Sequence, residues 1–321
     1  MSILQVKSVV KDLQGVRVVD EVTFTQHYKQ KLAIAGETGS GKSTLLKMIC
    51  GWVQPDAGEM TFEGQKIIGP EDQLLPGHPG IGYLSQHFEL RNNYRVYELL
   101  EMALQLEQQL ADKIFEVCRI SHLLRRRTDQ LSGGEKQRIA TARLLIAAPK
   151  LLLLDEPYSN LDMVHRNILK DVIKDIGEQL HITCLLISHD PVDILSWAEQ
   201  IIVMKGGKIL QQDTPEDLYF NPKDSYVAGL FGKYTELSPL QQKIFLFDSS
   251  KQPLKTSIFV RPEQFYITGD SQGVAGKVLK VEFLGSSYDV EILVDDFVVT
   301  VKSNMPNIQT GDVVHVGIGN L

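Results

Sequence analysis

The stretch GETGSGKST, residues 36–44, constrains the fold of this chain more than any other part of its sequence. It lies between the apolar run KLAIAG, which is typical of a short strand, and KSTLLKMICG, whose apolar residues have helical spacing. Gly36, Gly39 and Gly41 permit a tight backbone path that turns successive N–H groups inward on phosphate oxygens. A strand, a glycine-rich loop and a helix in this order predict an α/β P-loop domain that binds a nucleotide. The predicted phosphate-binding residues are Gly36, Glu37, Thr38, Gly39, Ser40, Gly41, Lys42, Ser43 and Thr44.

Two loop residues and two later carboxylates carry the polar chemistry. We expect Lys42 to neutralise the β- and γ-phosphates of ATP and Ser43 to ligate Mg²⁺ at a helix N-terminus. The apolar run LLLLDEP ends in Asp155, which is placed to hold the Mg²⁺ shell beside the loop. Glu156 follows directly and is placed to orient or deprotonate an attacking water. A structural ion-pair site is the weaker alternative for this acid pair.

His189 ends the apolar run in ITCLLISHD. A lone histidine after a strand is more often a packed or capping residue than a catalytic one. Parallel strands, however, deliver their carboxyl ends to one crevice, which would bring His189 to Asp155 and Glu156. Both interpretations of this histidine stay open at the level of sequence.

The chain divides into two parts of different character. Up to about residue 230, strand candidates alternate with helical patterns, and from about 94 to 130 the pattern is helical, without strand candidates. From about residue 237, short β-rich runs such as YDVEILVDDFVVTV are separated by Gly, Asp and Ser turns, which predicts a small β-barrel or sandwich. We expect a nucleotide-binding domain over residues 1–235, with a helical subdomain at about 87–135, and a β domain over residues 236–321.

Composition and charge exclude several classes of protein. Hydrophobic residues make up 43% and charged residues 23%, so the chain is globular rather than disordered. A formal net charge of −7 argues against a nucleic-acid-binding surface. Three widely spaced cysteines in apolar surroundings are consistent with core thiols in a reducing compartment. We find no signal-peptide pattern and no apolar run long enough to span a bilayer, so we expect a cytosolic chain that reaches a membrane through a partner.

Five motifs, taken in order, carry a family resemblance: GETGSGKST, LSGGEKQR, LLLLDEP, SNLD and LLISHD. Together they resemble the nucleotide-binding subunit of an ABC transporter over about residues 1–230. The resemblance is specific, because LSGGE distinguishes ABC ATPases from other P-loop proteins. It implies a P-loop fold with a parallel-sheet core, an N-terminal antiparallel β subdomain and a helical subdomain.

The resemblance also assigns roles to individual residues. Gln86 in GYLSQ corresponds to the glutamine that senses Mg²⁺ and the attacking water, Glu156 to the catalytic base, and His189 to the switch histidine at the γ-phosphate. Ser159 and Asp162 correspond to the D-loop. The predicted catalytic residues are Glu156, His189 and Gln86, and the predicted Mg²⁺ ligands are Ser43, Gln86 and Asp155.

The segment LSGGEKQR precedes LLLLDEP by only some twenty residues, yet the two are expected to serve different nucleotides. A helix N-terminus in this segment makes a second anion cradle. In ABC ATPases two domains pack head to tail, and each signature segment caps the ATP held by the other domain's P-loop. One chain carries one of each, so the resemblance implies a dimer with itself or with a similar chain. The cradle residues are Ser132, Gly133, Gly134 and Glu135.

The stretch KDLQGVRVV departs from the family pattern. Where the family has an aromatic ring that stacks on adenine, this sequence has Leu13. Leu13 and Val18 would give an apolar platform without the stacking interaction. Relaxed base selectivity and an aromatic ring from elsewhere are both consistent with this departure.

The C-terminal part resembles that of importer ATPases for sugars, polyamines, iron or oxyanions. In those proteins a β-barrel regulatory domain follows and often contains the sequence RPE. The RPE of this chain consists of Arg261, Pro262 and Glu263. Residues 237–321 are short for the sugar-importer version, so we expect one small OB-like (TOBE-like) unit. Sensing a solute and enlarging the dimer interface are the two roles considered for it.

The resemblance therefore implies the ATP-hydrolysing, energy-coupling subunit of an ABC importer, with ATP and Mg²⁺ as its ligands. Its expected partners are a second ATPase subunit (most simply another copy), transmembrane permease subunits and an extracytoplasmic solute-binding protein, with no nucleic acid. Its expected location is the cytoplasmic face of the cell membrane. The alternatives are a soluble ABC ATPase that acts as a clamp, and an exporter or lipoprotein-release ATPase. The C-terminal β domain favours import over export.

Overall fold

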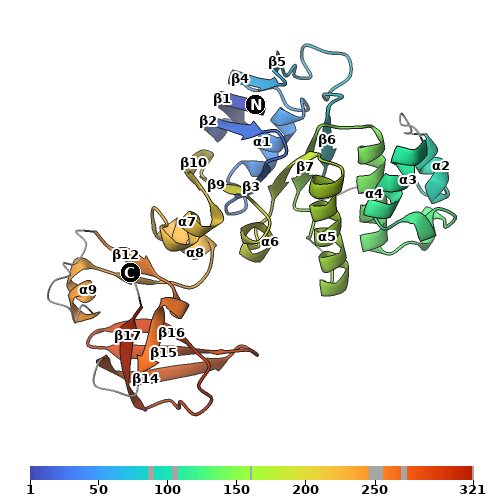
Figure 1. Ribbon diagram of the computed structural model, residues 1–321. Helices are drawn as coiled ribbons and strands as arrows, with labels where there is room; N and C mark the ends of the chain where they lie inside the picture. Colours follow the sequence, from blue (N-terminus) through green and yellow to red (C-terminus); the bar gives the residue numbers. More distant parts are fainter. Residues whose placement is uncertain (86–89, 103–107, 160, 246–255, 269–272, 320–321) are drawn as a thin grey trace. The chain divides into compact units, whose positions relative to one another are not determined.

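The computed structural model of the chain describes residues 1–85, 90–102, 108–159, 161–245, 256–268 and 273–319 (Figure 1). By its internal contacts the chain forms two compact units, Met1–Pro215 and Glu216–Leu321. Residues 216–235 thus pack with the second unit. The functional boundary expected after residue 235 stays a prediction.

The core of the first unit is a six-stranded sheet in the order β10-β9-β3-β8-β7-β6. Its strands are β3 (Lys31–Ala35), β6 (Ile81–Leu84), β7 (Leu151–Asp155), β8 (Thr183–Ile187), β9 (Gln200–Lys205) and β10 (Lys208–Asp213). All neighbours are parallel except β9 and β10. Every residue of β6, β7 and β8 is buried, as expected for strands covered on both faces. The polar residues that follow β7 and β8 therefore lie at one edge of the sheet.

An antiparallel sheet in the order β2-β1-β4-β5 adjoins this core. Its strands are β1 (Ser2–Leu13), β2 (Val16–His27), β4 (Ala57–Phe62) and β5 (Gln65–Lys66). Its buried side chains, among them Val6 and Phe24, share one hydrophobic core with Leu45 of α1 (Lys42–Ile49) and Ile34 of β3. The predicted N-terminal antiparallel subdomain is confirmed.

Besides α1, the described residues of the first unit form the helices α2 (Val96–Glu101), α3 (Gln108–Val117), α4 (Gly133–Ile146), α5 (Met163–Gln179) and α6 (Pro191–Leu195). The segment that the sequence predicts as helical is interrupted. After α3 the backbone of Arg119 adopts φ 54°, and two 3₁₀ turns, Ser121–Leu123 and Thr128–Gln130, lead to α4. Ile120 and Leu123 are buried and have the i, i+3 spacing of a helix, although this segment does not form an α-helix. Among the described residues, no helix is both long and apolar enough to cross a bilayer.

The second unit is β-rich, as predicted. It contains α7 (Pro215–Phe220), α8 (Ser225–Leu230), α9 (Pro239–Phe245) and the pair β11 (Thr235–Leu237) and β12 (Ile258–Val260). The main sheet has the order β13-β17-β14-β15-β16, from β13 (Phe265–Thr268), β14 (Val274–Phe283), β15 (Tyr288–Val294), β16 (Phe297–Ser303) and β17 (Val313–Ile318). All its pairs are antiparallel. Contacts between β16 and β13, the two ends of this order, show that the sheet curls toward a barrel.

Arg261 ties the helical start of the second unit to its sheet. Its side chain is fully buried and precedes a 3₁₀ turn that leads into β13. Its guanidinium lies 4.1 Å from the ring centroid of Tyr219. Its Nε and Nη1 atoms donate, over 2.9 to 3.2 Å, to the backbone carbonyls of Tyr219, Ala228, Gly232 and Lys233. The RPE motif therefore has a structural function in this chain: its arginine holds residues 219–233 in place.

Arg261→Met keeps a long unbranched side chain but removes these donors. We expect it to lower the free energy of unfolding of the second unit by about 2–5 kcal/mol, because each buried carbonyl left without a donor costs about 1–3 kcal/mol. Scanning calorimetry would measure the loss. Both tryptophans, Trp52 and Trp197, lie in the first unit, so their fluorescence should keep its wild-type midpoint. Lys277→Met, at an exposed position of β14, is the control; an unchanged calorimetric transition in Arg261→Met would contradict the prediction.

Candidate nucleotide site

The glycine-rich loop joins β3 to α1, as the sequence predicts. Gly41 adopts φ 96° directly before α1, and a β-carbon at this position would lie 2.0 Å from the carbonyl oxygen of Val18. Only glycine allows β2 to pass this close to the loop. The structure thus places Val18 against the phosphate loop, whereas Leu13 is 43% exposed at the tip of the β1–β2 hairpin.

Lys42 opens α1 and folds back over the loop that precedes it. Its ammonium group donates to the carbonyl oxygens of Gly36 (2.9 Å) and Glu37 (2.7 Å) and to the hydroxyl of Ser40 (3.2 Å). Burial lowers the pKa of Lys42, although the carboxylates of Glu156 and Asp155 oppose that shift. A buried cation at a helix N-terminus, beside backbone N–H groups that lack intrahelical partners, forms an anion-binding site.

Asp155, at the end of β7, accepts hydrogen bonds on both carboxylate oxygens. The hydroxyl of Ser43 donates to Oδ1 over 3.0 Å, and the hydroxyl of Tyr83 donates to Oδ2 over 2.7 Å. The contact between Ser43 and Asp155 joins two of the three residues predicted as Mg²⁺ ligands. Tyr83 is a site residue that sequence reasoning did not identify.

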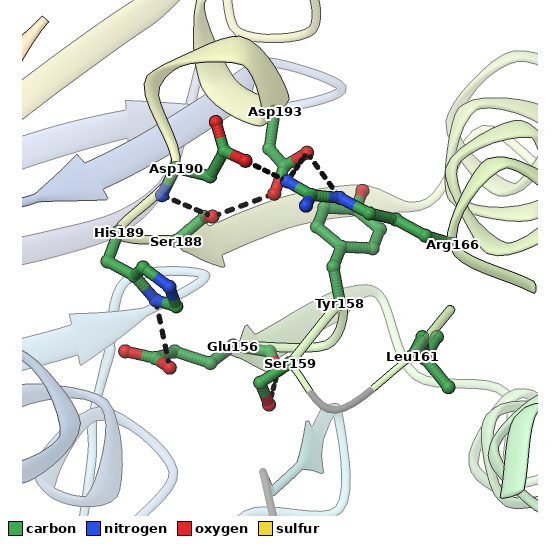
Figure 2. Close-up of a pocket in the computed structure, with 9 residues that line it drawn as sticks. All are labelled: Glu156, Tyr158, Ser159, Leu161, Arg166, Ser188, His189, Asp190 and Asp193. Atoms are coloured by element: carbon green, nitrogen blue, oxygen red, sulfur yellow. Dashed lines mark hydrogen bonds and ion pairs between the residues drawn. The ribbon is translucent and has the colours of Figure 1, made fainter. Parts of the chain in front are cut away.

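Glu156 and His189 both line a cavity of about 340 Å³ and contact each other there (Figure 2). The Nδ1 atom of His189 lies 3.2 Å from Oε2 of Glu156. The chain turns sharply after β7, because Glu156 adopts φ 47° and its backbone N–H donates to the carbonyl of Ile187 at the end of β8. The predicted meeting of Glu156 and His189 at the carboxyl ends of neighbouring strands is therefore observed.

An ion-pair cluster fixes the segment that carries His189. Asp193 on α6, whose side chain is 1% exposed, pairs with Arg166 and Lys170 of α5 over 2.7 Å and accepts from Ser188 over 3.0 Å. Arg166 also pairs with Asp190, the N-cap of α6 (Figure 2). These bonds hold both neighbours of His189 in place. The sequence gives no local signal for this cluster, because α5 and α6 are separate segments.

The signature segment forms a capped helix start. Ser132 is the N-cap of α4: its hydroxyl accepts from the N–H of Glu135 over 3.3 Å, and Glu135 Oε2 accepts from the N–H of Ser132 over 2.8 Å. This capping box gives Ser132 and Glu135 a structural role that their S-x-x-E spacing already indicates. Gly133 and Gly134 form the first turn of α4.

Gly134 is the point where α4 meets the D-loop segment. A β-carbon there would lie 2.6 to 2.9 Å from the imidazole and β-carbon of His165 on α5. The Nδ1 atom of His165 lies 2.5 Å from Oδ2 of Asp162, which caps α5. Ser159 donates to the carbonyl of Glu156 over 2.8 Å. The signature and D-loop residues are thus neighbours, whereas α4 and α1 lie apart in Figure 1, to either side of β6 and β7.

Not every predicted site residue can be placed. Gln86, predicted to sense Mg²⁺ and the attacking water, lies outside the described residues, as does Asn160 within the D-loop. The structure brings together the phosphate loop, Asp155, Glu156 and His189. It leaves Leu13 and the signature segment outside this group.

Comparison with known proteins places this chain in a family. The sequence matches the family described as "ABC transporter" over residues 19–159 and that described as "TOBE domain" over residues 258–319. The Fe(3+) ions import ATP-binding protein FbpC 2 of Rhodococcus jostii (strain RHA1) is 33% identical over 305 residues, covering 91% of this chain and 88% of that protein. The chain belongs to the ABC transporter family. The spermidine/putrescine import ATP-binding protein PotA of Clostridium novyi (strain NT) is 30% identical over 338 residues, covering 99% of this ABC ATPase and 95% of PotA.

The likeness extends to solved structures. CbiO1 from Clostridium perfringens, part of the ABC transporter complex cbiONQ, has a TM-score of 0.61 and 26% sequence identity, covering 68% of this chain and 90% of that one. The predicted P-loop fold, the TOBE-like domain and the function as an importer-type ATPase are confirmed. Use of a nucleotide follows from family membership.

Proposed function

We propose that this ABC ATPase hydrolyses Mg²⁺-bound ATP in two composite sites of a head-to-tail dimer and thereby drives import of a solute. The proposal rests on two hydrogen-bonded pairs that meet at adjacent residues of the chain. Ser43 and Asp155 meet beside the phosphate loop, and the next residue, Glu156, meets His189. A metal-binding pair and an acid–histidine pair on adjacent residues match the two requirements of phosphoryl transfer to water, charge neutralisation and proton removal.

Lys42 and the start of α1 would bind the phosphates. Lys42 is bonded to two loop carbonyls, which are neutral acceptors, and phosphate oxygens are stronger acceptors for an ammonium group. The backbone N–H groups of the first turn of α1 and the dipole of this helix both favour an anion at its N-terminus. Val18, against the loop, and Leu13 would provide the apolar surface for the base.

The donor set fits Mg²⁺. Among the described residues, no cluster of three or more His, Cys, Asp or Glu could hold a metal ion without help. Mg²⁺ is commonly held by one or two carboxylates together with substrate phosphates, and Ser43 and Asp155 supply hard oxygen atoms 3.0 Å apart. When bound, Mg²⁺ neutralises charge on the β- and γ-phosphate oxygens. Gln86 is the further ligand that the family resemblance assigns.

Glu156 would accept the proton of the attacking water. Its carboxylate faces the cavity, with a side chain 21% exposed, and His189 contacts it from the segment that follows β8. The ion pairs of Arg166 with Asp190 and Asp193 limit movement of the histidine segment. Glu156 therefore acts as the base, and His189 orients it and contacts the γ-phosphate.

The signature segment would complete the site of a second ATPase chain. Ser132, Gly133 and Gly134 begin α4 and are remote from α1 of the same chain (Figure 1). Contact between Gly134 and His165, next to Asp162, links the signature to the D-loop within one chain. The simplest partner is another copy of this chain.

Permease subunits in the membrane would receive the movement of the dimer. Both relatives named above are import ATP-binding proteins, which supports a location on the cytoplasmic face of the membrane and import with an extracytoplasmic solute-binding protein. Their solutes, ferric ions and polyamines, differ chemically, so the solute follows from the permease and binding protein. The C-terminal domain, from residue 236, would regulate or join the dimer.

Lys42→Ala tests the nucleotide site. We expect ATP affinity to fall by about 30-fold or more, since losing one partner of a desolvated charge pair costs at least about 2 kcal/mol, and turnover to be lost with it. Fluorescent-nucleotide titration and phosphate release would measure the two effects. Lys47→Ala, at an exposed position of the same helix, should behave as wild type. Equal affinity in Lys42→Ala and Lys47→Ala would refute the site.

A further inference from the structure

Asp155 is held from two sides, and the function proposed above gives a role to only one of its two partners. Ser43 bonds Oδ1, and Tyr83 bonds Oδ2. Tyr83 and Asp155 are buried, at 7% and 5% exposure. A hydroxyl-to-carboxylate bond of 2.7 Å in a buried position is a strong, directed contact.

The fold places the Tyr83 hydroxyl with little freedom. Strand β6 is parallel to β7, and Tyr83 is paired in register with Leu153. Asp155 comes two residues after Leu153, so the side chains of Tyr83 and Asp155 lie on the same face of the sheet. The rings of Trp52 and Tyr83 pack in an edge-to-face arrangement, with centroids 4.8 Å apart and planes at 61°. A phenol is protonated at neutral pH, so the Tyr83 hydroxyl donates this hydrogen bond to the Asp155 carboxylate.

We propose that Tyr83 is a positioning residue that orients the Asp155 carboxylate for the magnesium ion bound with ATP. The proposal rests on the function proposed above. A carboxylate on a single bond can rotate and exchange its two oxygens, and the Tyr83 hydroxyl fixes one of them. The other oxygen then faces Ser43, the second residue that would hold the ion. Partners of metal ligands act in this way and typically contribute about 10- to 100-fold to metal affinity.

A purely structural role for this hydroxyl makes a different prediction. If Tyr83 only satisfied a buried carboxylate, its loss would lower stability without changing how the nucleotide-loaded chain responds to metal concentration. The metal dependence therefore separates the two roles, and Tyr83→Phe is the appropriate variant because it keeps the ring and its contact with Trp52.

Tyr28→Phe is the matched control. The Tyr28 hydroxyl also donates to a carboxylate, that of Glu63, over 2.8 Å. Its neighbour Lys29 bonds the side chain of Thr183, the first residue of β8, so this tyrosine lies at the opposite edge of the sheet from Asp155. The control removes the same type of bond away from the nucleotide site.

The experiment uses the full chain saturated with a non-hydrolysable ATP analogue and Mn²⁺ as the probe ion. Electron paramagnetic resonance at free Mn²⁺ set by dialysis gives the concentration at which half of the loaded chain holds the ion. We expect this concentration to rise about tenfold in Tyr83→Phe and to be unchanged in Tyr28→Phe. The Mg²⁺ concentration that half-saturates ATP turnover should rise in parallel, and excess Mg²⁺ should restore the rate.

Two results would overturn the proposal. One is a Mn²⁺ curve for Tyr83→Phe that coincides with that of the wild type. The other is a turnover reduced equally at all Mg²⁺ concentrations, which is the behaviour of a structural hydroxyl. Failure of the proposed ATP site gives a different result, which is equal binding of the analogue by the wild type and by Lys42→Ala.

Discussion

Glu156→Gln should lower ATP turnover by about 10²- to 10⁴-fold, the range that a positioned general base contributes. The amide has nearly the same shape as the carboxylate and can keep a contact with His189, but it cannot accept the proton of the attacking water. ATP binding should persist because Lys42 and the phosphate loop are unchanged. Phosphate release measures turnover, and size-exclusion chromatography with light scattering should show a dimer that forms with ATP and persists.

The position of Glu156 among its acidic neighbours supports this choice of base. Asp193 is almost fully buried and paired with Arg166 and Lys170, and Asp190 is paired with Arg166. Asp155 accepts hydrogen bonds from two hydroxyl groups. Glu156 borders the cavity beside a histidine that is 65% exposed, so water can reach both groups.

Glu178→Gln is the control for this substitution, because Glu178 is a surface residue on α5 that pairs with Lys31. It should leave turnover and oligomeric state as in the wild type. Hydrolysis by Glu156→Gln at the wild-type rate would show that another group removes the proton. Loss of ATP binding in the same variant would show that the carboxylate serves the nucleotide rather than the water.

The residues that could be predicted from sequence are those whose geometry is set locally or by one general rule. Glycine spacing and the strand–helix context fix the path around Lys42, and the parallel-strand rule brings Asp155, Glu156 and His189 to one edge. The order of the strands in the sheet was not predictable in the same way. The bond from Tyr83 to Asp155 depends on β6 being the neighbour of β7, and no motif records this.

Other misses have a similar physical origin. Arg261 lies in a recognised motif, but its bonds to the carbonyls of residues 219–233 depend on how two distant segments pack. Ser132 and Glu135 show the opposite case. Their S-x-x-E spacing is the local pattern of a capping box, which is a second role beside the anion binding expected of both residues. A helix start can serve both purposes, since the cap satisfies some N–H groups and leaves others of the first turn available.

A mixture of Lys42→Ala and Ser132→Arg chains should hydrolyse ATP although neither variant does so alone. In a head-to-tail dimer of one chain of each kind, one site combines both defects and the other combines an intact phosphate loop with an intact signature. With random pairing and independent sites, turnover should reach roughly a quarter of the wild-type value. Arginine at position 132 puts a bulky side chain where the phosphate would approach the start of α4, and its positive charge is unfavourable at the N-terminal end of the helix dipole. Phosphate release from each variant and from the mixture measures the effect.

The controls separate a shared site from a folding defect. Ser121→Arg introduces the same side chain at an exposed turn before α4 and should retain full activity. Ser132→Arg alone should still bind ATP, since its own phosphate loop is intact, and should unfold in a cooperative transition only modestly below that of the wild type, because loss of the N-cap hydroxyl costs about 0.5–2 kcal/mol. Because each chain has one phosphate loop and one signature segment, a site formed within a single chain predicts no recovery on mixing. A mixture as inactive as its components would therefore argue against head-to-tail completion, and a fully active Ser132→Arg chain would remove the signature segment from the site altogether.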